Sequence, residues 1–157
     1  MRLAGPGIGL ILAAMAGWWL LGAPGMAPKG SGGLPEEMVS ARVSGVADGA
    51  AMVTPAVPET MSDDARMGAR AFEAKCVACH GENAAGVMGS GPPLVHKIYE
   101  PSHHADYAFE VAVKNGVRAH HWQFGDMAPV DGLTGADIRA ITAYVRELQR
   151  ANGIGVN

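Results

Sequence analysis

The sequence predicts a small all-α domain of about 3–5 helices in residues 61–157, preceded by an apolar N-terminal helix and a linker. Helix-capping residues and apolar residues at helical spacing recur along this domain, and an uncharged apolar stretch opens the chain. The chain contains 22 glycines and 10 prolines, and many of its apolar residues are alanines. A core of such small side chains is thin, so an additional apolar body such as a cofactor would help to fill it.

Charge and cysteine content exclude several classes of protein. The net charge of −3 is weak, and acidic and basic residues alternate along the chain without a basic stripe, which argues against nucleic acid as a partner. The two cysteines lie three positions apart. A secreted domain stapled by disulfides would need more cysteines, and a sulfur-based zinc site usually needs a second Cys or His pair.

Residues 1–23 predict export of the domain. Arg2 is followed by residues 3–23, which carry no charge. Arg2 and the α-amino group should stay on the cytoplasmic side, and everything after this stretch should cross the membrane. We therefore expect the domain on the periplasmic side of the inner membrane.

Two interpretations of residues 1–23 remain open. In the first, they form a signal peptide that is cleaved after the small-x-small sequence at residues 25–27. In the second, they form an uncleaved anchor, because roughly 20 apolar residues span a bilayer. Trp18 and Trp19 would then lie near the outer interface, although Pro6 weakens this reading. Both interpretations place the domain outside the cytoplasm, either soluble or anchored.

Residues 24–60 are predicted to be a flexible linker. They contain five prolines and a Gly-Ser run at residues 30–33, and no apolar period persists for long. Such composition is typical of a tether.

Three segments of residues 61–157 carry helix signals. The first helix should begin after Ser62, whose side chain can cap backbone N–H groups, and should continue to the cysteine pair. A middle helix is expected over residues 105–115. The closing helix should begin at Thr134, which with Asp137 resembles a capping box, and should stop before Gly153.

The string Cys76-Val77-Ala78-Cys79-His80 is the central motif. C-x-x-C-H is the attachment pattern for c-type haem. Two thiols one helical turn apart can add to two vinyl groups of a haem, and the next residue can point its imidazole at the iron. We therefore predict one covalent haem c at Cys76 and Cys79, with His80 as an iron ligand.

Two competing interpretations of this motif are weaker. A thioredoxin-like redox pair requires a βαβ context, and no strand pattern precedes Cys76. A zinc knuckle would need a second half that the chain lacks. The export signal favours haem, because attachment of this kind happens outside the cytoplasm.

Four separated features make the chain resemble a known family. They are the C-x-x-C-H motif, Gly-Pro-Pro-Leu at residues 91–94, Met-Ala-Pro at residues 127–129, and a closing amphipathic helix that contains Tyr144. With these features in this order, residues 62–151 resemble the class I, mitochondrial-like c-type cytochromes, in a bacterial exported or membrane-anchored monohaem form. The resemblance implies a class I fold built around one covalently attached haem.

The resemblance also implies roles for single residues. The carbonyl of Pro92 should accept a hydrogen bond from His80, and Leu94 should pack on the haem face. Met127 should be the second axial ligand, and His/Met ligation gives a higher potential than bis-His ligation. An ordinary Pro-Pro turn remains the alternative for Pro92, and Met88 is a rival to Met127 that follows His80 too closely to reach the opposite haem face.

The resemblance further implies how two helices cross. The closing helix should cross the first near Gly68 and Phe72, with Tyr144 in the contact. A small residue at Gly68 would let the two backbones approach closely.

Five histidines depart from the pattern of this family: His96, His103, His104, His120 and His121. They could be solvated surface residues, a docking patch that changes charge near neutral pH, or an exposed metal site, for example for copper. One of them could also replace Met127 in a bis-His haem. The sequence leaves these four interpretations open.

The predicted function is that of a one-electron carrier, not an enzyme, in a periplasmic or membrane-associated electron-transport chain. Its expected partners are a protein donor and a protein acceptor, and it should be a monomer. One alternative is a haem subunit or dedicated acceptor of a periplasmic dehydrogenase or oxidase. Another is a haem sensor or peroxidase, which would require an open axial position.

Overall fold

The computed structural model describes residues 45–155. Within this range the chain forms four α-helices and two short 3-10 helices: α2 (Asp63–Lys75), α3 (Val77–His80), Glu82–Ala84, Lys97–Tyr99, α4 (Asp106–Asn115) and α5 (Gly135–Ala151). No β-strand occurs between residues 45 and 155, where extended pairing is limited to three isolated bridges. The predicted all-α fold is therefore confirmed.

Two of the predicted capping residues start their helices as expected. The side chain of Ser62 accepts a hydrogen bond from the backbone N–H of Ala65 at 3.1 Å. Thr134 and Asp137 form a reciprocal capping box at the start of α5. Helix α4 begins one residue later than expected, because Ala105 has extended backbone angles and serves as its N-cap.

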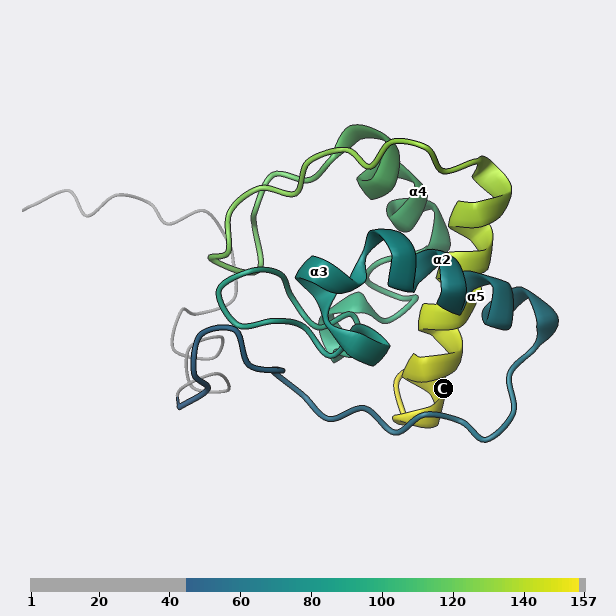
Figure 1. Cartoon of the computed structure of the whole chain (residues 1–157), viewed down its shortest axis with the longest axis horizontal. Helices are drawn as coiled ribbons and strands as arrows, with labels where there is room; N and C mark the ends of the chain where they lie inside the picture. Colours follow the sequence, from purple (N-terminus) through teal and green to yellow (C-terminus); the bar gives the residue numbers. More distant parts are fainter. Residues whose placement is uncertain (1–44, 156–157) are drawn as a thin grey trace, which may run out of the picture. The chain divides into compact units, whose positions relative to one another are not determined.

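Helices α2 and α5 cross, as Figure 1 shows, and Gly68 lies at their contact. A Cβ atom built on Gly68 would lie only 1.9 Å from the carbonyl oxygen of Ala140 in α5. Beside this contact, the rings of Phe72 and Tyr144 meet edge to face, with centroids 5.5 Å apart. The expected crossing, with Tyr144 in the contact, is present.

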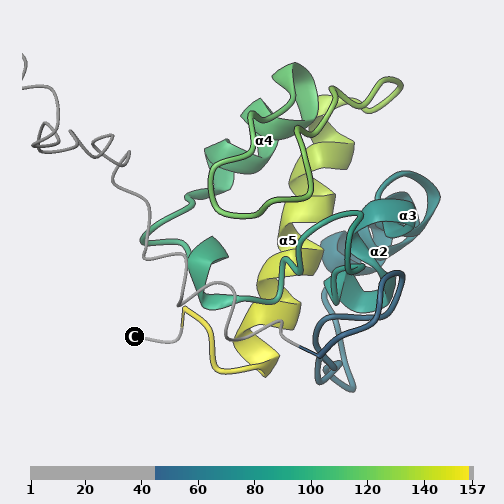
Figure 2. The same ribbon diagram turned by 90° about the vertical axis from the view of Figure 1, so that its left-hand side faces the viewer.

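The core lies between α2, α5 and the loop that follows α3. Its buried members are mostly small or aliphatic: Ala65, Phe72, Ala84, Val95, Ile141, Tyr144, Val145 and Leu148. Figure 2 shows α2 and α3 on one side of α5, and α4 with the loop that follows it on the other. Helix α5 therefore supports both halves of the domain.

Residues 45–60 differ from the expected flexible tether. The backbone N–H of Val53 donates to the carbonyl of Ala85 at 3.1 Å. Asn152, just beyond α5, receives the N–H of Ala56 and donates to its carbonyl, both at 2.8 Å. These bonds hold the segment against the domain, because its backbone N–H and C=O groups pair with residues of the domain instead of with water.

The predicted signal or anchor at residues 1–23 and the linker residues 24–44 lie outside the described range. Among residues 45–155, no helix combines the length and apolarity needed to cross a membrane.

Candidate functional site

The two cysteines lie at the junction of α2 and α3. Cys76 caps the C-terminus of α2, where its N–H donates to the carbonyl of Phe72 at 2.7 Å, and its own carbonyl accepts the N–H of His80 at 2.9 Å. This continuous turn places Cys79 one helical turn after Cys76. Both thiols are free, with Cys76 partly buried and Cys79 exposed. The pair can therefore bind one ligand through two sulfur atoms.

The environment of Cys76 differs from that of a redox-active thiol. Burial raises the pKa of Cys76 to about 11, and the neighbouring Cys79 acts in the same direction. Reactive thiols in C-x-x-C redox motifs have lowered pKa values instead. The structure thus disfavours the thioredoxin-like interpretation of the motif.

The imidazole of His80 is fixed by a proline carbonyl. Its Nδ1 atom lies 2.9 Å from the carbonyl oxygen of Pro92. When Nδ1–H donates to this oxygen, Nε2 keeps a lone pair for a metal ion. Burial lowers the pKa of His80, and this effect outweighs the opposing one of the Pro92 carbonyl. His80 is therefore suited to bind iron as a neutral imidazole.

A tightly packed loop brings Pro92 to His80. A Cβ atom on Gly91 would lie 2.6 Å from the carbonyl oxygen of Cys79, so only glycine fits against the end of α3. Val87 exchanges backbone hydrogen bonds with Gly91 at 2.9 and 3.0 Å. Pro92 was predicted from the sequence, whereas this role of Gly91 was not, although its place before the Pro-Pro pair could have indicated it.

Both backbone polar groups of Leu94, its N–H and its carbonyl, are hydrogen-bonded. Its N–H donates to the carbonyl of Ala84 at 2.9 Å, and its carbonyl accepts the side-chain amide of the buried Gln149 at 2.9 Å. The side chain is partly buried against the core. Helix α5 thus fixes Leu94 close after Pro92.

Met127 comes from a separate segment, the loop between α4 and α5. It pairs with Val117 through two backbone hydrogen bonds of 2.9 and 2.8 Å, which close a loop of residues 117–127. Gly116 has a φ of +75°, and a Cβ atom there would lie 2.5 Å from the Met127 carbonyl oxygen. The rival Met88 lies in another segment, where its backbone bonds Gly49 and Ala50 at 3.0 and 2.9 Å.

Trp122 lies within the loop of residues 117–127, and its indole N–H is buried. Its interaction with the Tyr99 side chain lowers the pKa of Tyr99, against the larger effect of burial, which raises that pKa to about 12. The indole ring stacks on Phe124, with centroids 5.8 Å apart. Trp122 thus links the loop of residues 117–127 to Tyr99 and Phe124.

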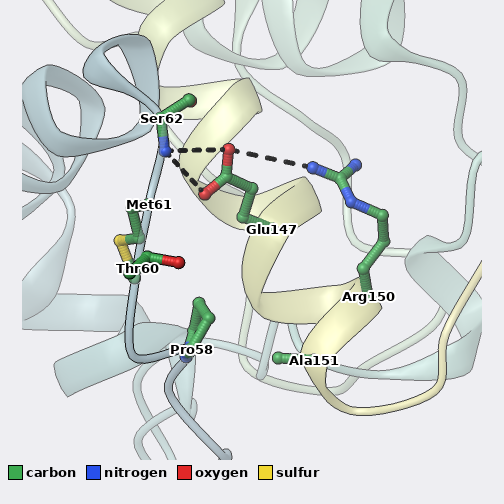
Figure 3. A pocket seen from close by; sticks show the side chains of 7 residues that line it. All are labelled: Pro58, Thr60, Met61, Ser62, Glu147, Arg150 and Ala151. Carbon is green, nitrogen blue, oxygen red and sulfur yellow. Dashed lines mark hydrogen bonds and ion pairs between the residues drawn. The ribbon is translucent and has the colours of Figure 1, made fainter.

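A separate hollow of about 490 Å³ lies against the C-terminal half of α5 (Figure 3). It is lined by Pro58, Thr60, Met61, Ser62, Glu147, Arg150 and Ala151. The backbone N–H of Ser62 donates to the Glu147 carboxylate at 3.2 and 3.4 Å, and Arg150 lies 3.9 Å from the same group. These contacts join the N-terminal segment to α5, and none of the predicted site residues lines the hollow.

Comparison with known proteins assigns the family. No curated protein matches the chain. The family model described as Cytochrome c matches residues 65–149, which is more than half of the chain. The match includes the C-x-x-C-H helix, Pro92 and Met127. Proteins of this family hold a covalent haem c with its iron and exchange electrons with redox proteins. This chain therefore belongs to the cytochrome c family, as a class I c-type cytochrome and haem-based electron carrier.

Proposed function

We propose that this protein carries single electrons between redox proteins on the periplasmic side of the inner membrane. In this proposal one haem is attached at Cys76 and Cys79, and its iron is bound by His80 and Met127. The observation that carries the proposal is the 2.9 Å contact between His80 Nδ1 and the Pro92 carbonyl. It leaves one nitrogen of a neutral imidazole for iron, directly after the two free thiols.

The two cysteines would fix the cofactor covalently. Each S–H would add across one vinyl group, so that a carbon–sulfur bond would form and the hydrogen would move to the neighbouring carbon. The segment from Cys76 to His80 would then hold two attachment points and one iron ligand within about one helical turn. When bound, the haem supplies an iron that gains and loses one electron.

Pro92 and Met127 would set the properties of the iron. A carbonyl that accepts the proximal N–H fixes the imidazole ring and raises its basicity toward the metal. A neutral thioether on the other side favours the reduced state and raises the potential. The paired backbone of Val117 and Met127 would limit movement of this ligand between oxidation states.

Two protein ligands would leave no open iron position for a substrate. The protein would then transfer electrons without making or breaking bonds of a substrate, and it would not act as a peroxidase or a haem sensor. The periplasmic location rests on Arg2 and the uncharged stretch at residues 3–23.

The attachment can be tested by extraction of the haem. In acidified acetone the haem should stay with the wild-type protein and should be released from a Cys76→Ser/Cys79→Ser double variant that has captured haem. The Met88→Ala variant is the control, and its haem should remain attached. Retention of haem by the double variant would refute the attachment sites.

A further inference from the structure

A cluster of histidines lies outside the residues proposed to hold the haem. His103 and His104 follow the 3-10 helix Lys97–Tyr99, and His120 and His121 lie in the loop of residues 117–127. The ring centroid of His121 lies 5.3 Å from that of His103 and 5.2 Å from that of His104. Two segments that are distant in sequence therefore converge on one group of imidazoles.

We propose that His103, His104 and His121 bind one divalent transition-metal ion, Cu(II) more tightly than Zn(II). One ring nitrogen of each residue lies within 4.8 Å of the others. Metal–imidazole bonds of about 2.0–2.1 Å place ligand nitrogens roughly 3.3 Å apart in a tetrahedral site, and neighbouring ones roughly 2.9 Å apart in the tetragonal geometry of Cu(II). The widest pair must therefore close by at most about 1.9 Å. His103 is exposed, so its side chain can make this movement.

The hydrogen bonds of the cluster prepare a ligand atom. His104 Nδ1 lies 2.6 Å from the carbonyl oxygen of Ile98. With the proton on Nδ1, the lone pair is on Nε2, which is the arrangement found in metal-binding histidines.

The His104 segment is held by a buried guanidinium. Arg146 in α5 is 6% exposed, and it donates to the backbone carbonyls of Tyr99, at 2.6 Å, and of His104. It also pairs with Asp106 at 2.7 Å. These bonds fix the loop from residue 99 to residue 106 to α5, so His104 is positioned by the fold before any metal arrives.

The loop that carries His121 is also closed by its own contacts. The carboxylate of Asp126 accepts the backbone N–H of Ala119 at 2.8 Å. The paired Val117 and Met127 close the base of the same loop. Because this loop is already closed, His121 loses less conformational entropy when a metal ion binds.

The protonation state of the cluster suits metal binding. Burial lowers the pKa of His121 to about 4, and His120, His104 and His103 act in the same direction. The pKa of His104 is lowered too, mainly by burial and also by His103, His120 and Arg146. At neutral pH these two imidazoles therefore offer lone pairs without first losing protons.

The donor type decides which metal fits. Three neutral nitrogens suit copper and zinc, whereas magnesium and calcium prefer oxygen ligands. Among divalent first-row ions, Cu(II) binds such sites most tightly. Since His103 is exposed, the fourth position would be open to water.

The test uses the full haem-loaded protein, prepared without a polyhistidine tag and stripped of metals with a chelator. Calorimetric titration with Cu(II), and separately with Zn(II), should show one saturable site and tighter binding of Cu(II). His103→Ala, His104→Asn and His121→Asn should each weaken Cu(II) binding by more than about tenfold. Asn at position 104 keeps an amide donor for the Ile98 carbonyl and removes the Nε2 ligand.

His96→Asn is the matched control. It removes an imidazole outside the triad but keeps a side-chain acceptor for the N–H of Ile98, which His96 Nδ1 now caps at 3.2 Å. Its affinity for Cu(II) should equal that of the wild type. The proposal is wrong if no saturable site exists, if Zn(II) binds more tightly than Cu(II), or if the three variants bind as tightly as the control.

A second measurement covers variants that fail to fold. In the wild-type protein labelled with ¹⁵N-histidine, one equivalent of Zn(II) should shift the imidazole resonances of His103, His104 and His121. Shifts confined to other histidines would overturn the proposal.

Discussion

The Nδ1 atom of His80 lies 2.9 Å from the carbonyl oxygen of Pro92, although twelve positions separate the two residues. The contact depends on Gly91, whose backbone packs against the end of α3 where no Cβ atom fits. The loop thus connects a local motif, C-x-x-C-H, with the group that orients its histidine.

Gly91→Ala should disturb this contact. The new methyl group would lie 2.6 Å from the carbonyl oxygen of Cys79, so the loop must shift. Overpacking of this kind costs about 1–3 kcal/mol, and we expect that loss in the free energy of unfolding of the holoprotein in urea. The potential should also rise, because His80 without its acceptor is a weaker electron donor and stabilises ferric iron less. In Gly135→Ala, the methyl group meets only the flexible side chain of Arg139 at 3.5 Å, and both values should stay near wild type.

Gly68→Ala tests the packing of the two main helices. A Cβ atom at this position would lie 1.9 Å from the carbonyl oxygen of Ala140, and helix backbone cannot yield as a side chain can. We expect a loss of about 3 kcal/mol or more in the free energy of unfolding, measured by chemical denaturation. An unchanged denaturation midpoint would show that α2 and α5 do not approach as described.

Met127→Ala should open the sixth iron position and lower the reduction potential. Axial ligands tune haem potentials over a range of roughly 0.8 V, and loss of the thioether removes the preference for reduced iron. Met127→His should keep a filled position but also lower the potential, as bis-His ligation does. Met88→Ala is the comparison and should leave potential and spectrum unchanged. An unaltered spectrum in Met127→Ala would assign the ligand elsewhere.

Acid should destabilise the metal-free holoprotein through the histidine cluster. The pKa of His121 is about 4 in the folded chain, below its ordinary value of 6.5. Between these values the unfolded chain binds more protons, so stability falls as the pH drops from 6.5 toward 4. The pKa of His104 is lowered as well and adds to the effect.

Thermal unfolding at a series of pH values measures this dependence. The His121→Asn variant should lose less of its Tm between pH 6.5 and pH 4 than the wild type does. Equal losses in the two proteins would show that His121 titrates normally. Because both proteins contain His80, its contribution to the pH dependence of Tm cancels in the comparison.

The parts that the sequence predicted are those encoded locally. Ser62 and the Thr134–Asp137 box mark helix starts because a cap involves residues three positions apart. The C-x-x-C-H motif is likewise contained in five positions, so its chemistry can be read without a fold.

The parts that the sequence could not predict depend on distant partners. Residues 45–60 carry no periodic pattern, and Ala56 is held by Asn152, which lies 96 positions away. The histidine cluster needs two loops to converge, and the anchor of one loop is Arg146 in α5. Such contacts follow from the three-dimensional arrangement and leave no local signal.

The measurement that tests the central claim most directly is a redox titration of the wild-type holoprotein, followed by visible and near-infrared absorption. We predict a single one-electron transition, low-spin spectra in both states, and a near-infrared band of thioether-bound ferric iron in the oxidised protein. A high-spin spectrum, or the absence of the thioether band, would contradict His80/Met127 ligation.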